Sequence, residues 1–197
     1  TDNTVSSSIL PASSEAEYPQ SQWQVKNPAE LGVAEEKVKR LFDLSFSDSS
    51  TQGVVLIKDG YLIGERYAEG FEQSSYGTSW SMAKSFYASL IGISIDRGEI
   101  NSLDDKVADY LDYFSDQRAE ISIRDLLDMS SGLEMPDHKH ENMFFSRDHL
   151  AYARDVGVEK PAGQKFEYNN VNSMLLAEII EKATGQKADA LLKERVF

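Results

Sequence analysis

The sequence TSWSMAKSFYASLIGISIDRG, at residues 78–98, predicts a long helix at the centre of the fold. Apolar and small side chains occur all round the helical wheel from Met82 to Ile95, and Gly98 is typical of a helix C-terminal cap. The stretch therefore predicts a helix that is buried on most sides. Ser81 and Lys84 lie three residues apart at its start, so their side chains share one face.

A serine hydroxyl held beside a lysine amine has a chemical use. The hydroxyl becomes a nucleophile when a neighbour accepts its proton, and a lysine can accept it when desolvation or nearby positive charge keeps the amine neutral. The partial positive charge at a helix N-terminus favours an alkoxide on Ser81 and a neutral Lys84. A Ser-x-x-Lys pair also occurs by chance, so a purely structural helix start stays open at this point.

Toward the N-terminus, a β-hairpin is the clearest signal. Residues 53–58 and 61–67 are β-rich runs joined by Asp59-Gly60, a dipeptide that suits a two-residue hairpin turn. An isolated hairpin is marginal in water, so we expect it to belong to a larger sheet. A helix is predicted before it, over residues 34–46, and residues 1–27 are predicted to be an extended or mobile lead-in.

Beyond residue 98 the sequence predicts only helices and loops. One helix is expected over residues 123–129, and residues 134–147 are expected to form a polar loop. His138 and His140, with Asp137 and Glu141, have spacings that match neither one helix face nor a zinc pattern, which favours a solvated loop without a metal. His149 is interpreted as structural, so no histidine supports a Ser-His-Asp triad.

The second informative stretch is KPAGQKFEYNNVN, at residues 160–172. A turn at residues 161–163 leads to Tyr168 and Asn170, and a helix with an apolar face is predicted to follow and to end at Gly185. Taken alone, Tyr168 is better explained as a rim aromatic than as an acid/base group. Asn170, taken alone, is better explained as a helix N-cap than as a functional residue.

Composition sets the outer limits. The chain has 197 residues, a formal net charge of -13 and a pI near 4.6, which argues against nucleic-acid or anionic-membrane partners because both are polyanions. No run approaches the roughly 18 apolar residues of a membrane span, and the absence of cysteine excludes a thiolate nucleophile. The start at Thr1 fits either a removed export signal or a trimmed sequence, and of the two we expect export, which would make the protein periplasmic or secreted.

Four motifs, taken together in order and spacing, resemble the serine β-lactamase and penicillin-recognising hydrolase superfamily. The likeness covers residues 28–197 and is to the class C-like branch, which includes esterases, D-aminopeptidases, D,D-peptidases and 6-aminohexanoate-dimer hydrolases. The sequences Ser-Met-Ala-Lys-Ser and Met-Ser-Ser-Gly-Leu look most like those of the 6-aminohexanoate-dimer hydrolases. The motifs are SMAKS at 81–85, RDLLDMSSGL at 124–133, PAG at 161–163 and FEYNN at 166–170.

The resemblance implies an α/β fold, with an antiparallel sheet flanked by helices, and a role for each motif residue. Ser81 would be the acylated nucleophile, and Lys84 and Tyr168 would be its acid/base groups. Which of the two is the base stays open, because the pair titrates together. Asn170 would orient Lys84 or the substrate amide, and the backbone N–H of Ser81 would donate to the oxyanion. The implied substrate is a small amide or ester, with no cofactor.

The third family motif, Lys-Thr-Gly or a His-x-Gly relative on a later strand, is absent from this sequence. The run at residues 182–185 has an extra residue and is interpreted as a helix end. Residues 28–197 thus resemble the N-terminal part of one domain, which lacks its C-terminal strands. We therefore expect a complementary C-terminal polypeptide. The alternative function is a binding or sensor protein of the same fold that is acylated once or not at all.

Overall fold

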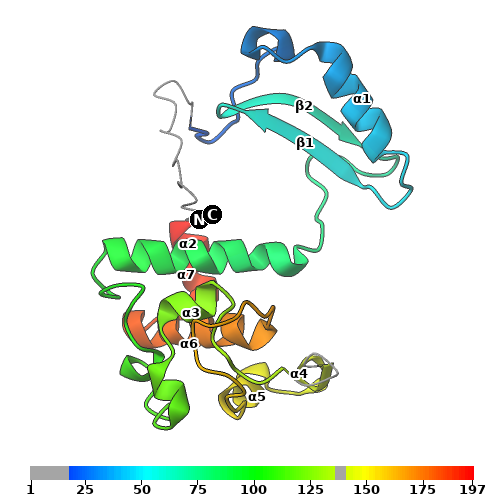
Figure 1. Ribbon diagram of the computed structural model, residues 1–197. Helices are drawn as coiled ribbons and strands as arrows, with labels where there is room; N and C mark the ends of the chain where they lie inside the picture. The colour runs from blue at the N-terminus through cyan, green and yellow to red at the C-terminus, as the bar shows by residue number, and fades with distance from the viewer. Residues whose placement is uncertain (1–17, 136–140) are drawn as a thin grey trace, which may run out of the picture. The chain divides into compact units, whose positions relative to one another are not determined.

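The computed structural model describes residues 18–135 and 141–197, and the chain forms two units that meet in sequence after Gly77 (Figure 1). We call residues 18–77 the hairpin unit and the described residues from Thr78 onward the helical unit. The hairpin unit contains η1 (Pro28–Leu31), α1 (Glu35–Ser45), β1 (Gly53–Lys58) and β2 (Tyr61–Tyr67). Ser81, Lys84, Tyr168 and Asn170 all belong to the helical unit.

The hairpin formed by β1 and β2 is antiparallel and has the strand bounds that the sequence predicts. Asp59 and Gly60 both have positive φ angles, 51° and 82°, as the tight two-residue turn requires. The register shifts between Leu56 and Ile57, which marks a β-bulge in β1. The hairpin prediction is confirmed. In the described residues it forms a sheet of two strands.

Helix α1 packs on the hairpin through a close approach to β2. Val38 and Phe42 are its buried residues, and they meet Gly64. A Cβ atom at Gly64 would lie 3.0 Å from the Phe42 ring and 3.2 Å from Val38, so glycine is what lets the helix come this near. The helix predicted over residues 34–46 is confirmed to within one residue at each end.

The segment before η1 pairs with β2 at one position. The backbone N–H of Leu62 donates to the carbonyl of Gln24 at 2.9 Å, and the N–H of Lys26 donates to the carbonyl of Leu62 at 3.1 Å. Residues 24–26, at the end of the predicted lead-in, therefore lie against the sheet. Residues 1–17 lie outside the described residues, and the domain boundary at residue 27 stays a prediction.

The helical unit is built around α2 (Ala83–Asp96) and α6 (Asn170–Thr184), which pack against each other. Side chains from most of its helices and loops form one buried cluster that includes Leu90, Ile91, Ile100, Phe114, Leu126, Leu175 and Ile179. The other elements are η2 (Trp80–Met82), η3 (Val107–Asp109), η4 (Gln117–Glu120), α3 (Ile123–Leu127), α4 (Glu141–Phe145), α5 (His149–Arg154) and α7 (Ala188–Arg195).

The expectation that the central helix is buried on most sides is wrong for the described structure. Leu90, Ile91 and Ser94 are the buried residues of α2, whereas Ala88 and Gly92 are exposed. The physical reason is that α6 and α7 pack on one side of this helix. An all-round apolar composition thus shows that a helix tolerates burial, without showing which faces are covered.

Two local predictions in the helical unit are corrected. The expected loop over residues 134–147 contains α4, whose formation is explained by Met143, which is 1% exposed in the core. Residues 137, 138 and 140 of the histidine-rich run lie outside the described residues. Helix α3 ends two residues earlier than expected because Met129 has a left-handed φ of 55°. The predicted end of α6 at Gly185 is confirmed, with φ 73°.

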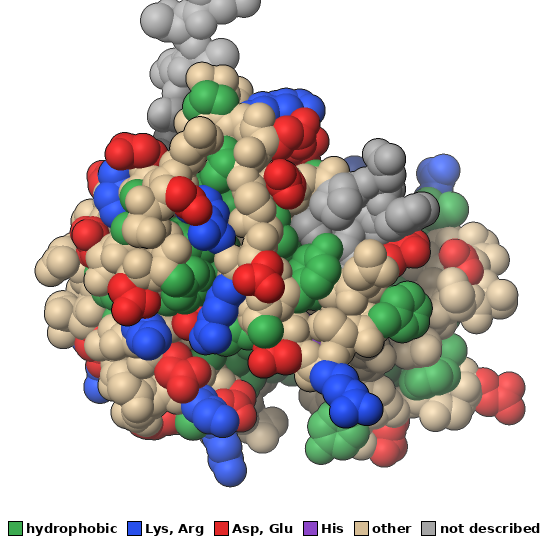
Figure 2. All heavy atoms as spheres, turned by 90° about the horizontal axis from the view of Figure 1, so that it is seen from below, with side chains coloured by type: hydrophobic (Ala, Val, Ile, Leu, Met, Phe, Trp, Pro, Cys, Tyr) green, Lys and Arg blue, Asp and Glu red, His purple; other side chains and the backbone are tan. Residues whose placement is uncertain are grey.

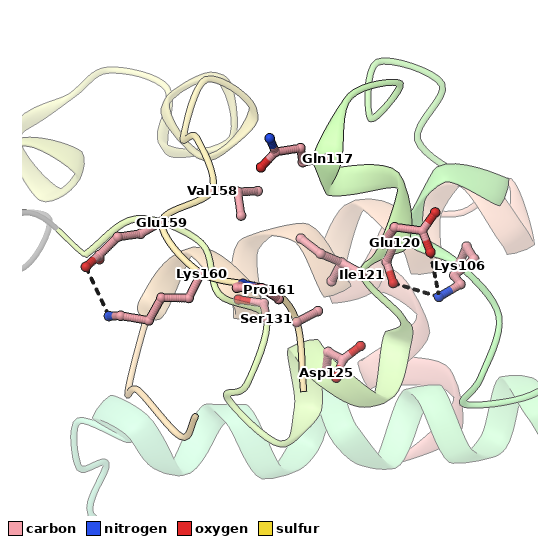
Figure 3. Close-up of a pocket in the computed structure, with 11 residues that line it drawn as sticks. Lys106, Gln117, Glu120, Ile121, Asp125, Ser131, Val158, Glu159, Lys160 and Pro161 are labelled. Carbon is pink, nitrogen blue, oxygen red and sulfur yellow. Dashed lines mark hydrogen bonds and ion pairs between the residues drawn. The ribbon is translucent and has the colours of Figure 1, made fainter. Parts of the chain in front are cut away.

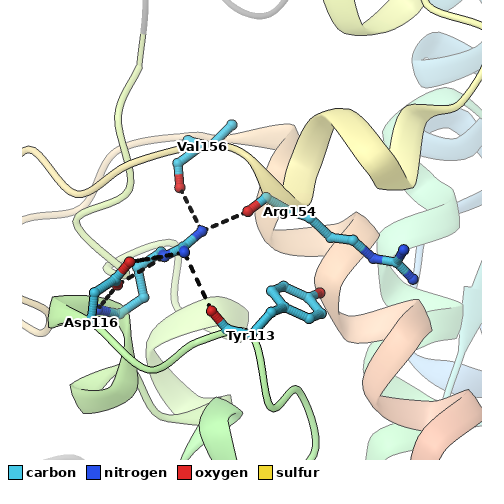
Figure 4. A network of polar contacts seen from close by, with 5 residues as sticks. Tyr113, Asp116, Arg154 and Val156 are labelled. Atoms are coloured by element: carbon cyan, nitrogen blue, oxygen red, sulfur yellow. Dashed lines mark hydrogen bonds and ion pairs between the residues drawn. The ribbon is translucent and has the colours of Figure 1, made fainter.

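A polar network around Arg118 ties the η4 region to α5 and to the segment after it (Figure 4). The Arg118 guanidinium donates to the carbonyls of Arg154 at 2.6 Å, Val156 at 3.3 Å and Tyr113 at 3.4 Å. Arg154 in turn forms an ion pair of 2.6 Å with Glu178, which is 3% exposed and accepts a hydrogen bond from the Tyr113 hydroxyl. Burial is the main cause that raises the pKa of Tyr113, and the hydrogen bond to the Glu178 carboxylate is the next largest.

Helix α7 is fixed to the end of α2 by a two-pronged ion pair. Arg195 donates to both carboxylate oxygens of Glu99, at 2.7 and 2.8 Å, across 96 residues of sequence. The hydrogen bonds from Arg195 are the main cause that lowers the pKa of Glu99 from its ordinary value.

Acidic and basic side chains are interspersed over the face drawn in Figure 2. None of the helices described at residues 18–135 and 141–197 is long and apolar enough to cross a bilayer.

Candidate active site

Ser81 lies in η2, at the junction where the chain enters α2. The residue before it, Trp80, has a φ of 45°, which is left-handed and unfavourable for a side chain with a Cβ atom. Strain of this kind costs on the order of 1–3 kcal/mol and is tolerated where the surrounding structure imposes it. The strained turn sets Ser81 at the start of the helix, on the same face as Lys84.

Three side chains from two distant parts of the sequence meet at Ser81. The Oη atom of Tyr168 lies 2.6 Å from Ser81 Oγ, and either hydroxyl can be the donor. Lys84 Nζ donates to the same Oγ atom at 3.2 Å and lies 5.0 Å from the centre of the Tyr168 ring. The structure thus brings together Ser81, Lys84 and Tyr168, which the sequence singled out.

The electrostatics of this cluster lower the pKa of the Tyr168 phenol. The pKa of Tyr168 is lowered from its ordinary value, first by Lys84 and then by the hydrogen bond with Ser81. Burial acts in the opposite direction but is weaker, since 46% of the residue is exposed. A phenolate at Tyr168 can accept the proton of Ser81, while Lys84 supplies the positive charge that stabilises it.

The segment that carries Tyr168 is held by the loop after α3. The backbone N–H of Glu167 donates to the carbonyl of Met129 at 2.8 Å, and the N–H of Gly163 donates to the carbonyl of Ser130 at 2.8 Å. The residues of this loop belong to the motif at 124–133, for which the sequence alone indicates no role. Their backbone contacts explain why such a motif accompanies Tyr168.

Gly132 makes a close approach between these two segments possible. It has a φ of 71°, and a Cβ atom there would lie only 2.0 Å from the carbonyl oxygen of Lys160. The carbonyl of Gly132 also accepts hydrogen bonds from the N–H groups of Glu159 and Lys160, at 2.9 and 3.2 Å. Any side chain at position 132 would therefore push the Tyr168 segment away.

The N-cap of α6 is one residue earlier than the sequence suggested, at Asn169 instead of Asn170. The N-cap of α6 is Asn169, whose side chain accepts from the N–H of Val171 at 2.9 Å, so the N-cap alternative for Asn170 is wrong. Asn170 is the first residue of α6. No hydrogen bond between Asn170 and Lys84 occurs in the described structure, and the orienting role of Asn170 stays a prediction.

The helical unit also contains a cavity that Ser81, Lys84 and Tyr168 do not line (Figure 3). It has a volume of about 550 Å³ and involves Lys106, Glu120, Ser131, Lys160 and Pro161 among its lining residues. Both lysines already have partners, since Lys106 Nζ donates to the carbonyl of Glu120 at 2.7 Å and Lys160 pairs with Glu159 at 3.1 Å. The cluster of Ser81, Lys84 and Tyr168 is therefore distinct from the residues that line this cavity.

The described residues offer no cluster of metal-binding side chains. Across residues 18–135 and 141–197, no group of three or more histidine, cysteine, aspartate or glutamate side chains is arranged to bind a metal ion. His149, which was interpreted as structural, starts α5 and contacts the Phe144 ring edge to face, with 6.4 Å between ring centres.

A family model described as Beta-lactamase matches residues 53–197, which include the whole cluster. The chain belongs to the beta-lactamase family. It is similar to a D-aminopeptidase from Brucella anthropi, with 31% identity over 161 residues that cover 73% of this chain and 30% of that protein. Penicillin-binding protein 4 from Amycolatopsis lactamdurans is 33% identical over 126 residues, 60% of this chain and 32% of that protein.

Solved structures give the same fold for this beta-lactamase family member. A protein from Bacillus anthracis assigned as a 6-aminohexanoate-dimer hydrolase aligns with a TM-score of 0.65 and 24% identity, over 81% of this chain and 46% of its own. An octameric penicillin-binding protein homologue from Pyrococcus abyssi aligns with a TM-score of 0.64 and 23% identity, over 83% and 42%. The predicted fold class is confirmed, and the chain spans less than half of these relatives' lengths.

Proposed function

We propose that this chain carries the nucleophile of a serine hydrolase that cleaves a small amide or ester through an acyl-enzyme on Ser81. The observation that carries the proposal is the convergence of Tyr168 and Lys84 on one oxygen, at 2.6 and 3.2 Å. A nucleophile within hydrogen-bond reach of its base is the general signature of covalent catalysis. Membership of the beta-lactamase family supports the same reaction class.

In the proposed reaction, Ser81 Oγ attacks the substrate carbonyl carbon as its proton passes to Tyr168 or Lys84. The carbonyl oxygen becomes an oxyanion, for which the backbone N–H of Ser81 is the proposed donor. Collapse of this intermediate breaks the bond to the leaving amine or alcohol, which takes the proton. Water then attacks the acyl ester with the same base, which releases the acid and restores the Ser81 hydroxyl.

A complementary polypeptide is part of this proposal. The outer edge of β1 has no partner strand in the described residues, and Val55 and Ile57 on this strand are about half exposed. An open edge with apolar side chains favours pairing with a further strand. We propose that such a segment also supplies the missing third motif and a second oxyanion donor.

The experiment is intact-protein mass spectrometry after treatment with a serine-acylating fluorophosphonate. Wild type, alone and with any co-purifying polypeptide, is compared with Ser81→Ala and Ser89→Ala. Ser89 is the control because it is an exposed serine on α2, the helix that follows Ser81. One adduct is expected on wild type and on Ser89→Ala, located at Ser81 by peptide mapping, and none on Ser81→Ala. An adduct that persists in Ser81→Ala, or the lack of any adduct on wild type both alone and with a co-purifying polypeptide, would reject the proposal.

The similarity to penicillin-binding protein 4 favours one second candidate, a protein that is acylated once without turnover. The two candidates differ in the rate at which the acyl group leaves Ser81. A chromogenic ester and a fluorescent β-lactam followed over time separate them. Repeated turnover of either compound supports the hydrolase, whereas a stable adduct at one equivalent with both supports the binding protein.

A further inference from the structure

Asn172 is a fully buried amide on α6 that the proposed reaction does not use. It is 0% exposed and lies in a helix whose buried residues are mostly apolar, such as Val171 and Leu175. Burying an amide is costly unless its polar atoms have partners. Both ends of this one do: its Oδ1 atom accepts from Ser131 Oγ at 2.8 Å, and its Nδ2 atom lies 3.4 Å from Met129 Sδ.

The two partners of Asn172 belong to the loop that holds the Tyr168 segment. Met129 has a left-handed φ of 55°, a conformation that a residue with a Cβ atom adopts at a cost. In this conformation its carbonyl accepts the N–H of Glu167, the residue directly before Tyr168. The Asn172 amide thus bonds to the side chain of Met129. The backbone carbonyl of Met129 in turn bonds to Glu167, which directly precedes Tyr168.

We propose that Asn172, Ser131 and Met129 form a clamp that positions the Tyr168 phenol against Ser81. This inference rests on the proposed function, in which the phenol exchanges a proton with Ser81. Asn172 has no hydrogen bond with Ser81, Lys84 or Tyr168 in the described structure, so it is a positioning residue. Its effect passes through the Met129 carbonyl to the backbone of Glu167.

The clamp matters because the proposed proton transfer takes place over a short distance between two oxygen atoms, so a small displacement of either one affects it. The Tyr168 and Ser81 oxygens are 2.6 Å apart, and the lowered pKa of Tyr168 depends on Lys84 and Ser81 lying this near. A displacement of about 1 Å at a reacting group can cost roughly a hundredfold in rate. Loosening the clamp therefore predicts a slower acylation and a phenol pKa closer to its ordinary value, without loss of the fold.

The test compares three clamp variants, Asn172→Leu, Ser131→Ala and Met129→Leu, with two controls. The controls are Ser173→Ala and Glu178→Gln, which alter buried polar residues of the same helix. Neither side chain has a hydrogen bond with the loop among the described residues, and Glu178 pairs with Tyr113 and Arg154 instead. The first measurement is the pKa of Tyr168, from a pH titration of the intact chain with ¹³Cζ-labelled tyrosine, its signal assigned by its absence in Tyr168→Phe. The second is the rate of fluorophosphonate labelling at Ser81.

For the clamp variants we expect the Tyr168 pKa to rise toward about 10 and the labelling rate to fall by about ten- to a hundredfold. Circular dichroism checks that each variant is folded, and Ser131→Ala removes only one oxygen should Asn172→Leu unfold. Control variants are expected to lose thermal stability while keeping the pKa and the rate. The clamp is rejected if folded clamp variants keep the wild-type pKa, or if the controls shift it equally.

The titration separates this inference from the proposed function. It reports on Tyr168 whether or not Ser81 reacts. A wild type that is never labelled rejects the hydrolase, and the titration still decides whether the clamp sets the phenol. Normal labelling with an unchanged titration in Asn172→Leu rejects the clamp alone.

Discussion

The hairpin unit and the helical unit differ in how much of their polar and apolar surface is committed to internal contacts. In the hairpin unit, apolar side chains such as Val55 and Ile57 stay about half exposed, and one strand edge lacks a partner in the described residues. In the helical unit a continuous buried cluster surrounds paired polar groups such as Asn172 and Glu178. The comparison teaches that the proposed chemistry belongs to the better-packed unit.

The largest contrast is expected between two tyrosines. Tyr168→Phe removes the phenol beside Ser81 and is expected to lower the rate of acylation by about 10²–10⁴-fold, the usual contribution of a general acid or base. Tyr67→Phe removes a phenol that bonds to Glu65 in the hairpin unit and is expected to leave the rate unchanged. Stopped-flow labelling with a chromogenic ester measures both. Equal rates for Tyr168→Phe and wild type would remove Tyr168 from the mechanism.

Packing gives the next contrast. Leu175 is 0% exposed at the centre of the helical core, so Leu175→Ala is expected to lower the free energy of unfolding by about 2–5 kcal/mol. Val55→Ala in β1 alters a side chain that is 49% exposed and is expected to cost about 0.5 kcal/mol or less. Urea titrations followed by circular dichroism compare them. Similar costs for both would contradict the difference in packing between the units.

Two helix caps give a smaller contrast. Asn169 caps α6, is 2% exposed and also donates to the carbonyl of Glu134 at 3.2 Å, so Asn169→Ala is expected to cost about 2 kcal/mol. Asn27 caps η1 at an exposed position, so Asn27→Ala is expected to cost about 1 kcal/mol or less. The same urea titration measures both, and a larger cost for Asn27→Ala would reverse the comparison.

The smallest expected effect is the loss of stability at high pH. The pKa of Tyr110 is raised to about 12, mainly by burial and secondly by the hydrogen bond to Asp105. A raised pKa favours the neutral phenol in the folded state, so its contribution is complete below about pH 10 and is lost as the pH rises toward 12. Thermal melts across this range are expected to fall less steeply for Tyr110→Phe than for wild type.

The hairpin unit supplies the matched control for that slope. The pKa of Tyr67 is also raised, by its hydrogen bond to Glu65, but this phenol is in contact with solvent. Water screens its interaction, so Tyr67→Phe is expected to leave the slope of melting temperature against pH unchanged. A flatter slope in Tyr67→Phe than in Tyr110→Phe would contradict the assignment.

The sequence predicted the local parts of this structure well. Ser81 and Lys84 share a face because a separation of three residues on a helix sets it, and the Asp59-Gly60 turn follows from its backbone preference. Tyr168 lies 87 residues from Ser81, and only the family resemblance joined the two before the structure was known. Long-range pairing has no periodicity that one sequence can reveal.

The rest of the site escaped prediction for physical reasons. The contact between the Met129 carbonyl and Glu167 uses backbone atoms, which every residue has, and a left-handed methionine has no sequence signature. The exposed side of α2 was missed because its small side chains are compatible with burial and with exposure alike. Helix α4 was missed because one buried methionine, Met143, lies in a polar stretch.

The ion pair between Arg195 and Glu99 has a consequence for synthesis in the cell. The two residues are 96 positions apart, so at about 5–20 residues per second the ribosome adds Arg195 some 5–20 s after Glu99. Until the ribosome reaches Asn170, α2 exists without its partners α6 and α7, and its apolar residues Leu90 and Ile91 lack these contacts. A nascent chain paused in this window is therefore a natural client for chaperones that bind exposed apolar helices.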